Sequence, residues 1–150
     1  MDAIHGHRAA LEPVARLFTS AGLYAYRTLD EENRWCVACD LDDGHIDVRI
    51  GADGYELDVW ATSPGMFADE ENDRRRGALE RLARISIPSI RRGYLDDNQT
   101  LEWNHEQHGI SLRTSYFVPF SAGERIPEIA TSQLAELNAS LRRIEQKIGE

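Results

Sequence analysis

Apolar residues recur at helical spacing near the start of the chain. From about residue 3 to residue 21 they lie three and four positions apart, and Gly22 follows where a left-handed helix cap belongs. Pro13 fits a helix only in the first turn, where its missing N–H does no harm. The regular part of this helix is therefore expected to begin near Glu12.

A second apolar stripe closes the chain and predicts a helix from about Pro127 to Ile148. The stripe consists of Leu134, Leu137, Leu141, Ile144 and Ile148. Such a stripe could pair helices between two chains. Packing on a sheet within one chain is favoured, because barely three heptads are present.

Between these helices the period of the pattern changes from helical to alternating, which is typical of strands with one buried face. Three segments alternate in this way, 35–41, 46–50 and 55–61, and turn residues separate them at 42–44 and 52–54. The sequence therefore predicts an antiparallel meander of three strands.

The second half of the chain continues with a helix and a hairpin. Acids come first and arginines later from Asp69 to about Ile85, the order that suits a helix dipole, and Pro88 is expected to end this helix. Strands are expected at 101–104 and 110–118, with the turn at 106–109. We therefore predict an α+β fold over residues 1–150, a single domain of order α-β-β-β-α-β-β-α in which helices pack on an antiparallel sheet.

Length and charge limit the function classes. A chain of 150 residues with 41% hydrophobic content builds one ordinary core. It has no apolar run long enough for a signal peptide or a membrane span, so a soluble cytoplasmic protein is expected. The formal net charge of −9 disfavours nucleic acid and anionic lipid as partners. Arg74, Arg75 and Arg76 follow four acids within seven residues and are interpreted as part of a solvated helix face.

The two cysteines, Cys36 and Cys39, lie three apart in a predicted strand, where their side chains face opposite ways. They are expected to be buried core residues without a disulfide. No second Cys or His pair at suitable spacing completes a zinc site.

Acids crowd the first hairpin, which raises the possibility of a metal or paired-carboxylate site. Asp40, Asp42, Asp43 and Asp47 do not follow the calcium-loop pattern, since Gly44 and Gly51 fall where oxygen ligands belong. Turn chemistry is the favoured reading of these residues.

The histidines and possible nucleophiles do not indicate a metal or catalytic site either. The pairs His105 with His108 and His5 with His7 lack a third ligand. No nucleophile elbow and no phosphate loop is present. We therefore expect no catalytic residues, no metal and no cofactor.

Large apolar residues on strand faces that should be wet point to protein binding instead. Trp60 alternates with Leu57 and Val59, and Phe117 alternates with Tyr116 and Val118, so each lies on the second face of its strand. An equally good interpretation is that the chain's own helix or loops cover that face. The candidate protein-binding residues are Trp60, Phe117, Trp103, Leu137 and Leu141.

The order of elements resembles that of class I type III secretion chaperones and of the related YbjN family of bacterial proteins over nearly the whole chain. Local segments are also similar, namely Ala83–Ile85, Arg92–Leu95, Leu101–Trp103 and Gly109–Arg113. The resemblance implies a homodimer that holds an extended segment of a client protein, and it implies no catalytic residues.

The expected function is therefore that of a non-enzymatic chaperone-like or adaptor protein. The alternative is an acidic inhibitor or immunity-type protein that blocks a partner enzyme. The net charge and the acids of the first hairpin motivate this alternative.

Overall fold

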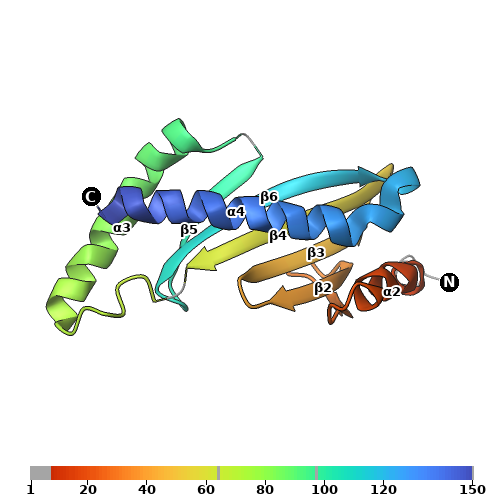
Figure 1. Ribbon diagram of the computed structural model, residues 1–150, viewed down its shortest axis with the longest axis horizontal. Helices are drawn as coiled ribbons and strands as arrows, with labels where there is room; N and C mark the ends of the chain where they lie inside the picture. Colours follow the sequence, from red (N-terminus) through yellow and green to blue (C-terminus); the bar gives the residue numbers. More distant parts are fainter. Residues whose placement is uncertain (1–7, 64, 97, 150) are drawn as a thin grey trace. The chain divides into compact units, whose positions relative to one another are not determined.

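The computed structural model describes residues 8–63, 65–96 and 98–149. It shows an α+β protein with a six-stranded antiparallel sheet and helices packed against it, in the strand order β1-β2-β3-β4-β6-β5 (Figure 1). The predicted fold class is confirmed. The elements are α2 (Glu12–Ser20), β1 (Tyr26–Leu29), β2 (Trp35–Leu41), β3 (Gly44–Ile50), β4 (Gly54–Ser63), α3 (Asp73–Tyr94), β5 (Gln99–Asn104), β6 (Gly109–Pro119), the 3-10 helix η1 (Phe120–Arg125) and α4 (Ile126–Gly149).

The backbone forms two compact units. The first consists of Met1–Val59 with Ser115–Ala135, and the second consists of Trp60–Thr114 with Glu136–Glu150. Strands β4 and β6 and helix α4 each contribute residues to both units.

In the first unit, α2 lies against β1, β2 and η1. The helix begins at Glu12 with Pro13 in its first turn, as predicted. Gly22 adopts a left-handed conformation with φ +83°, and the next N–H, of Leu23, donates to the carbonyl of Phe18 at 2.9 Å. This arrangement satisfies carbonyls that the end of the helix would otherwise leave unpaired. The part of the predicted helix that falls on residues 3–7 lies outside the described residues.

Strand β1 was not predicted, and the meander has four strands instead of three. It pairs with β2 from Tyr26 opposite Ala38 to Leu29 opposite Trp35. Its four residues are too few to show an alternating period, and three of the four are half-buried. Cys36 and Ala38 of β2 are as deeply buried as Val37 and Cys39, although the two pairs face opposite sides, so both faces of β2 are covered.

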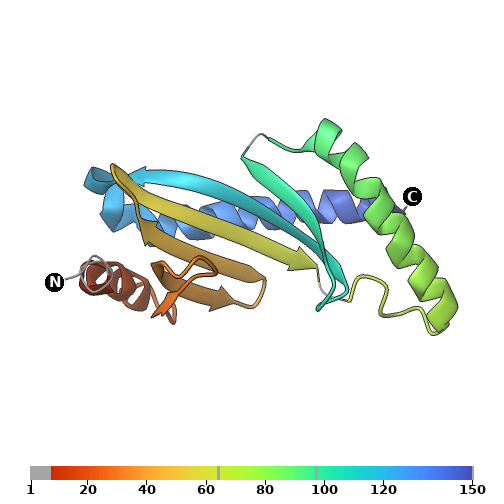
Figure 2. The same ribbon diagram turned by 180° about the vertical axis from the view of Figure 1, so that it is seen from behind.

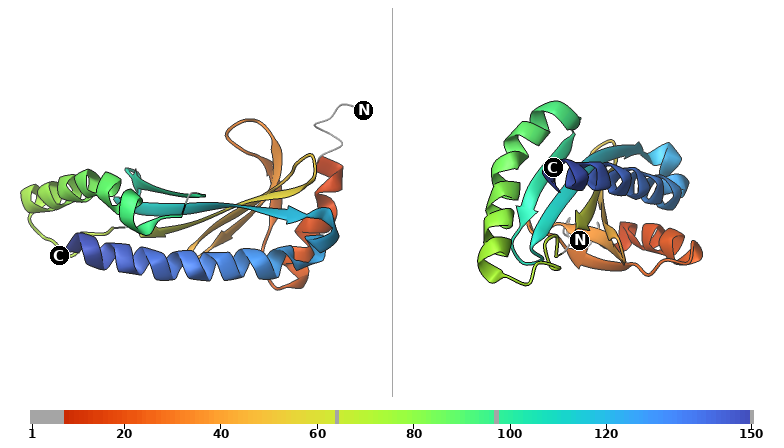
Figure 3. Two further views of the ribbon diagram at one scale, coloured as in Figure 1. Left: turned by 90° about the horizontal axis from the view of Figure 1, so that it is seen from above. Right: turned by 60° about the vertical axis from the view of Figure 1, so that its left-hand side comes forward.

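In the second unit, β5 and β6 form the predicted hairpin, with Leu101 opposite Leu112 and Trp103 opposite Ile110. Figure 3 shows the C-terminal half of α4 along one face of this hairpin. Leu137 and Leu141 of α4 are each 2% exposed. The stripe on the last helix therefore packs within the chain, as the favoured interpretation had it.

Helix α3 contacts β5 in the same unit (Figure 2), and both predicted ends of the helix are wrong. It begins at Asp73 and not Asp69, because the side chain of Asn72 accepts the N–H of Arg75 at 3.0 Å and caps the helix there. It continues through Pro88 to Tyr94. Ile87 and Ile90, on either side of the proline, are 7% and 4% exposed, so their burial offsets the missing hydrogen bond.

Within the described residues, no helix is long and apolar enough to cross a membrane.

Candidate functional site

The β2–β3 hairpin of the first unit holds a chain of polar contacts centred on His45. His45 lies directly opposite Asp40 in the ladder, and Asp47 follows two residues later on the same side of β3. The ring Nδ1 of His45 contacts Asp40 Oδ1, and its Nε2 lies 2.7 Å from Asp47 Oδ1. The hydroxyl of Tyr26, on β1, donates to Asp40 Oδ2 at 2.7 Å. We call these four residues the His45 cluster.

The charges of the His45 cluster support one another. Burial disfavours the charged imidazole, but the hydrogen bonds and charges of Asp47 and Asp40 outweigh it and raise the pKa of His45. The hydrogen bond from Tyr26 lowers the pKa of Asp40, and the contact with His45 adds to this effect. The hydrogen bond to Asp40 in turn raises the pKa of Tyr26 to about 12. These contacts therefore favour the imidazolium form of His45 and the neutral form of the Tyr26 phenol.

This geometry suits a clamp better than a catalyst. A general base needs a ring nitrogen that can accept a proton from a substrate, but both nitrogens of His45 already face carboxylates. Among the described residues, no group of three His, Cys, Asp or Glu side chains could hold a metal ion. The acids of this hairpin therefore fasten three strands together. Sequence reasoning missed His45, although the spacing Asp-x4-His-x-Asp across a tight turn predicts that these three side chains meet.

A second polar cluster in the same unit is centred on Arg49, two residues after Asp47. Its Nη2 lies 2.6 Å from Asp58 Oδ2, and its side chain and that of Asp58 are 11% and 2% exposed. Asp30 and Glu56 lie 3.8 Å from the same guanidinium. The hydroxyl of Ser115 donates to the other oxygen of Asp58 at 2.8 Å. We call Asp30, Arg49, Glu56, Asp58 and Ser115 the Arg49 cluster.

Asp58 lies on the second face of β4, where the alternating pattern predicts a solvent-exposed aspartate. Its carboxylate is buried instead, and the ion pair with Arg49 compensates the cost of burying it. Desolvation opposes the charge of the guanidinium, yet the hydrogen bond and charge of Asp58 raise the pKa of Arg49. Arg49 therefore stays charged in the folded chain.

Neither cysteine is set up as a nucleophile. Both are fully buried and free, as the sequence predicted. Burial, with Asp47 and Asp30 nearby, raises the pKa of Cys36 to about 12, and burial followed by the charge of Asp40 raises the pKa of Cys39. Since a thiolate is the reactive form, these thiols are inert at neutral pH.

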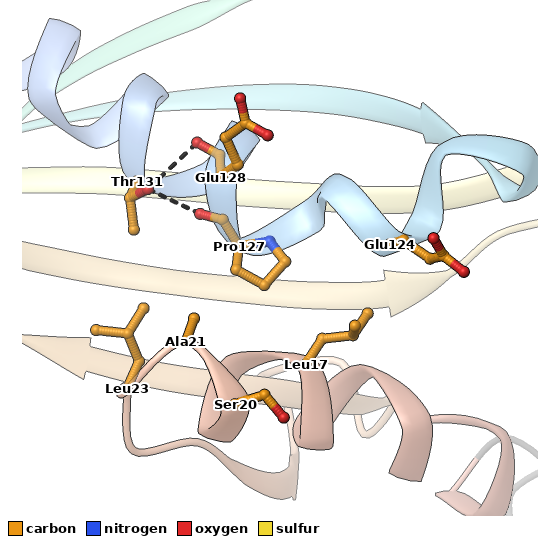
Figure 4. A pocket seen from close by; sticks show the side chains of 8 residues that line it. All are labelled: Leu17, Ser20, Ala21, Leu23, Glu124, Pro127, Glu128 and Thr131. Carbon is orange, nitrogen blue, oxygen red and sulfur yellow. Dashed lines mark hydrogen bonds between the residues drawn. The ribbon is translucent and has the colours of Figure 1, made fainter.

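An open groove of about 490 Å³ lies between the end of α2 and the start of α4, within the first unit (Figure 4). Its lining includes Leu17 and Leu23 from the α2 side and Pro127 from the α4 side. The carboxylate of Glu128 is turned away from the α2 side and lies 3.6 Å from the guanidinium of Arg125. The hydroxyl of Thr131 is turned back on its own helix and donates to the carbonyl of Pro127 at 2.8 Å. The groove therefore offers mainly apolar walls to an incoming side chain.

Three aromatic side chains of the first unit are exposed. Phe117 on β6 is 53% exposed, Phe120 on η1 is 49% exposed and Tyr116 is 39% exposed. Phe117 lies over Gly54, where an added Cβ would come within 2.6 Å of its ring, whereas Tyr116, the preceding residue of the strand, points to the other face. Phe120 packs edge-on against Tyr55 with ring centroids 5.2 Å apart. We call the exposed ring of Phe117 and the backbone of β4 at Gly54 beneath it the Phe117 surface.

In the second unit, Trp60 and Trp103 lie on opposite faces of the sheet. The guanidinium of Arg113 stacks over Trp60 at 5.5 Å, and Trp103 is paired with Ile110, which points away from Arg113 on β6. Both tryptophans are half-buried. The structure does not bring these two candidate residues together, because Ile110 and Arg113 are three positions apart on a strand and therefore point to opposite faces.

The remaining candidates are placed as follows. Leu137 and Leu141 are buried within the chain, so they are not part of its surface. His105 is exposed, and His108 lies 3.2 Å from Glu80 in a left-handed turn with φ 53°. His5 and His7 lie outside the described residues.

No family model matches the sequence, and no curated protein matches it. Among solved structures, the chain is similar to an uncharacterized protein from Methanothermobacter thermautotrophicus. The two share 15% sequence identity with a TM-score of 0.46, over 93% of this chain and 96% of that chain.

Proposed function

We propose that the protein is a non-enzymatic protein-binding module, chaperone-like or adaptor in kind, that acts as a homodimer and holds a segment of a client protein. The Phe117 surface is the observation that carries this proposal. It exposes 53% of Phe117, on the face of β6 opposite to Tyr116. Large exposed aromatic side chains often take part in association, because aromatic residues dominate the energies of interfaces.

Two further observations support a binding role. Tyr26, Cys36 and His45, whose pKa values are all raised, are held in states that suit structure better than chemistry. The groove beside the α2 helix offers apolar walls to an incoming side chain. The resemblance to class I type III secretion chaperones and to the YbjN family implies the same mode of action, with the cytoplasm as its setting.

The first test is the state of assembly and its dependence on Phe117. Sedimentation at micromolar concentration should show a dimer, and affinity capture from the native cell should yield a stoichiometric partner. Phe117→Ser should weaken one or both associations by about tenfold or more, the loss expected at an interface hot spot. Tyr24→Ser is the matched control, since Tyr24 is 78% exposed and lies outside the Phe117 surface. A strict monomer would remove the dimer from the proposal, and unchanged associations in Phe117→Ser would remove this surface.

An acidic inhibitor remains the second candidate, because Asp42 and Asp43 are exposed at the tip of the β2–β3 hairpin in a chain of net charge −9. The dependence of binding on salt separates the two functions. An inhibitor that acts through charge should lose affinity steeply as salt rises, whereas a client held by aromatic contacts should not.

A further inference from the structure

Helix α3 has a charge opposite to that of the rest of the protein. Asp73–Tyr94 contains seven arginines and two acids, a net charge of +5, whereas the whole chain carries −9, so the remaining residues carry −14. The sequence interpretation balanced Arg74, Arg75 and Arg76 against the acids that precede them. Among the three, and within the part of the chain that the structure describes, Arg76 is the one that pairs with such an acid, Asp73, and it also donates to the backbone carbonyl of Glu70.

The outward side of α3 is also apolar. Leu82 is 59% exposed and Ile85 is 72% exposed, although Ala83, Ile87 and Ile90 on the inner side are buried. Leu82 and Ile85 lie about one helical turn apart, so together they form a continuous apolar strip along the helix. A soluble chain gains nothing from this strip unless a partner covers it.

Arg81 and Arg84, both exposed, flank this strip. Neither side chain makes an ion pair or a hydrogen bond with any residue that the structure describes. The nearby acid on the same helix, Glu80, is occupied by His108 at 3.2 Å. We call Arg81, Leu82, Arg84 and Ile85 the α3 face.

We infer that the α3 face docks an acidic protein segment that carries apolar side chains. The apolar anchors of such a segment would cover Leu82 and Ile85, and its carboxylates would pair with Arg81 and Arg84. The inference goes beyond the proposed function, because it concerns a surface of the second unit and does not depend on Phe117.

Other occupants fit the α3 face less well. A symmetric contact with a second copy would set Arg81 and Arg84 against the same arginines. A nucleic acid would leave Leu82 and Ile85 uncovered. It would also be repelled by the net negative charge of the rest of the chain. A bilayer surface requires a broader apolar face than two side chains provide.

The test is the binding of a short fluorescent peptide in which leucines, spaced three and four apart, are separated by glutamates. Binding to the full chain should weaken with salt and should disappear when glutamine replaces the glutamates. Arg81→Gln with Arg84→Gln should weaken it by about tenfold or more, as should Leu82→Ser with Ile85→Ser. Arg142→Gln with Arg143→Gln, at two exposed arginines of α4, should leave it unchanged.

Several results would overturn the inference. Equal losses in the α3 and α4 variants would show that the peptide responds to general charge. Tighter binding to vesicles of phosphatidylserine and phosphatidylcholine in equal parts, or to a single-stranded oligothymidine, would assign the face to lipid or nucleic acid. Loss of self-association in the α3 variants would assign it to a second copy. Because Phe117→Ser should leave this peptide bound, failure of the proposed function is distinguishable from failure here.

Discussion

The side chains of Asp40 and His45 meet directly across the β2–β3 ladder, where their backbones are also paired. Asp47 completes the contact on the other side of the imidazole at 2.7 Å. The hairpin is therefore closed by a charged ring between two carboxylates, and its strength depends on the proton that His45 carries.

This proton makes the stability of the chain depend on pH. The folded pKa of His45 is raised above the ordinary value of 6.5, so its contribution is fully present below about that pH and is lost as pH rises through the folded pKa. The free energy of unfolding should fall as pH rises above about 6.5, and His45→Gln should flatten the fall. Urea unfolding across this range checks the prediction. An equal slope in both proteins would show that other groups cause it.

The Arg49 cluster predicts a large penalty for an unpaired buried charge. Arg49→Met leaves the carboxylate of Asp58, 2% exposed, without its ion pair and should cost about 3–5 kcal/mol of stability. Replacing both residues, Arg49→Met with Asp58→Leu, should recover much of that loss. Arg16→Met is the control, because the Arg16–Glu12 pair is 76% and 48% exposed and should matter by less than about 1 kcal/mol. A double variant no more stable than the single one would contradict the argument.

Gly54 is predicted to tolerate no side chain. A Cβ at this position would lie 2.5 Å from the carbonyl oxygen of Val118 and 2.6 Å from the ring of Phe117. Gly54→Ala should therefore destabilise the chain by about 1–3 kcal/mol, since the backbone contact cannot yield by a rotamer change. Gly77→Ala in α3, where the nearest atom is a flexible Arg81 nitrogen at 3.7 Å, should stabilise it by about 0.5–1 kcal/mol. Thermal unfolding of both variants measures the contrast.

The variant Trp60→Ala tests whether Trp60 takes part in association. Trp60 is half-buried under Arg113, so its removal should leave the chain folded and weaken dimerisation or client binding by about tenfold or more. Trp103→Ala, on the opposite face of the same unit, is the control for a general loss of packing. If Trp60→Ala instead lowers the unfolding temperature markedly while association per folded molecule stays the same, Trp60 is a core residue.

Long segments with a regular apolar period were predictable from the sequence. Short segments, and segments whose conformation depends on tertiary contacts, were not. The apolar stripe of α4 and the alternation of β5 and β6 gave their elements within a few residues, because burial of one face imposes the period. Strand β1 has four residues, fewer than two full alternations, so its pairing with β2 decides its conformation. The passage of α3 through Pro88 is also a tertiary effect, since it depends on the burial of Ile87 and Ile90.

The polar clusters show where sequence reasoning stopped. Asp40 and Asp47 were recognised as an unusual concentration of acid, but His45 between them was not weighed as their partner. For Asp58, alternation reports the side to which the side chain points, and not that Arg49 of the neighbouring strand lies beside it. Contacts between strands that are distant in sequence decide both cases.

The burial of Cys36 and Cys39 has a practical consequence for every experiment above. With both thiols inaccessible and protonated at neutral pH, maleimide reagents should leave the native chain unmodified. A single cysteine introduced at an exposed position would then carry a dye or a spin label alone, without removal of the natural pair. Distances between labels on the two units could thus be measured in a protein whose own core remains intact.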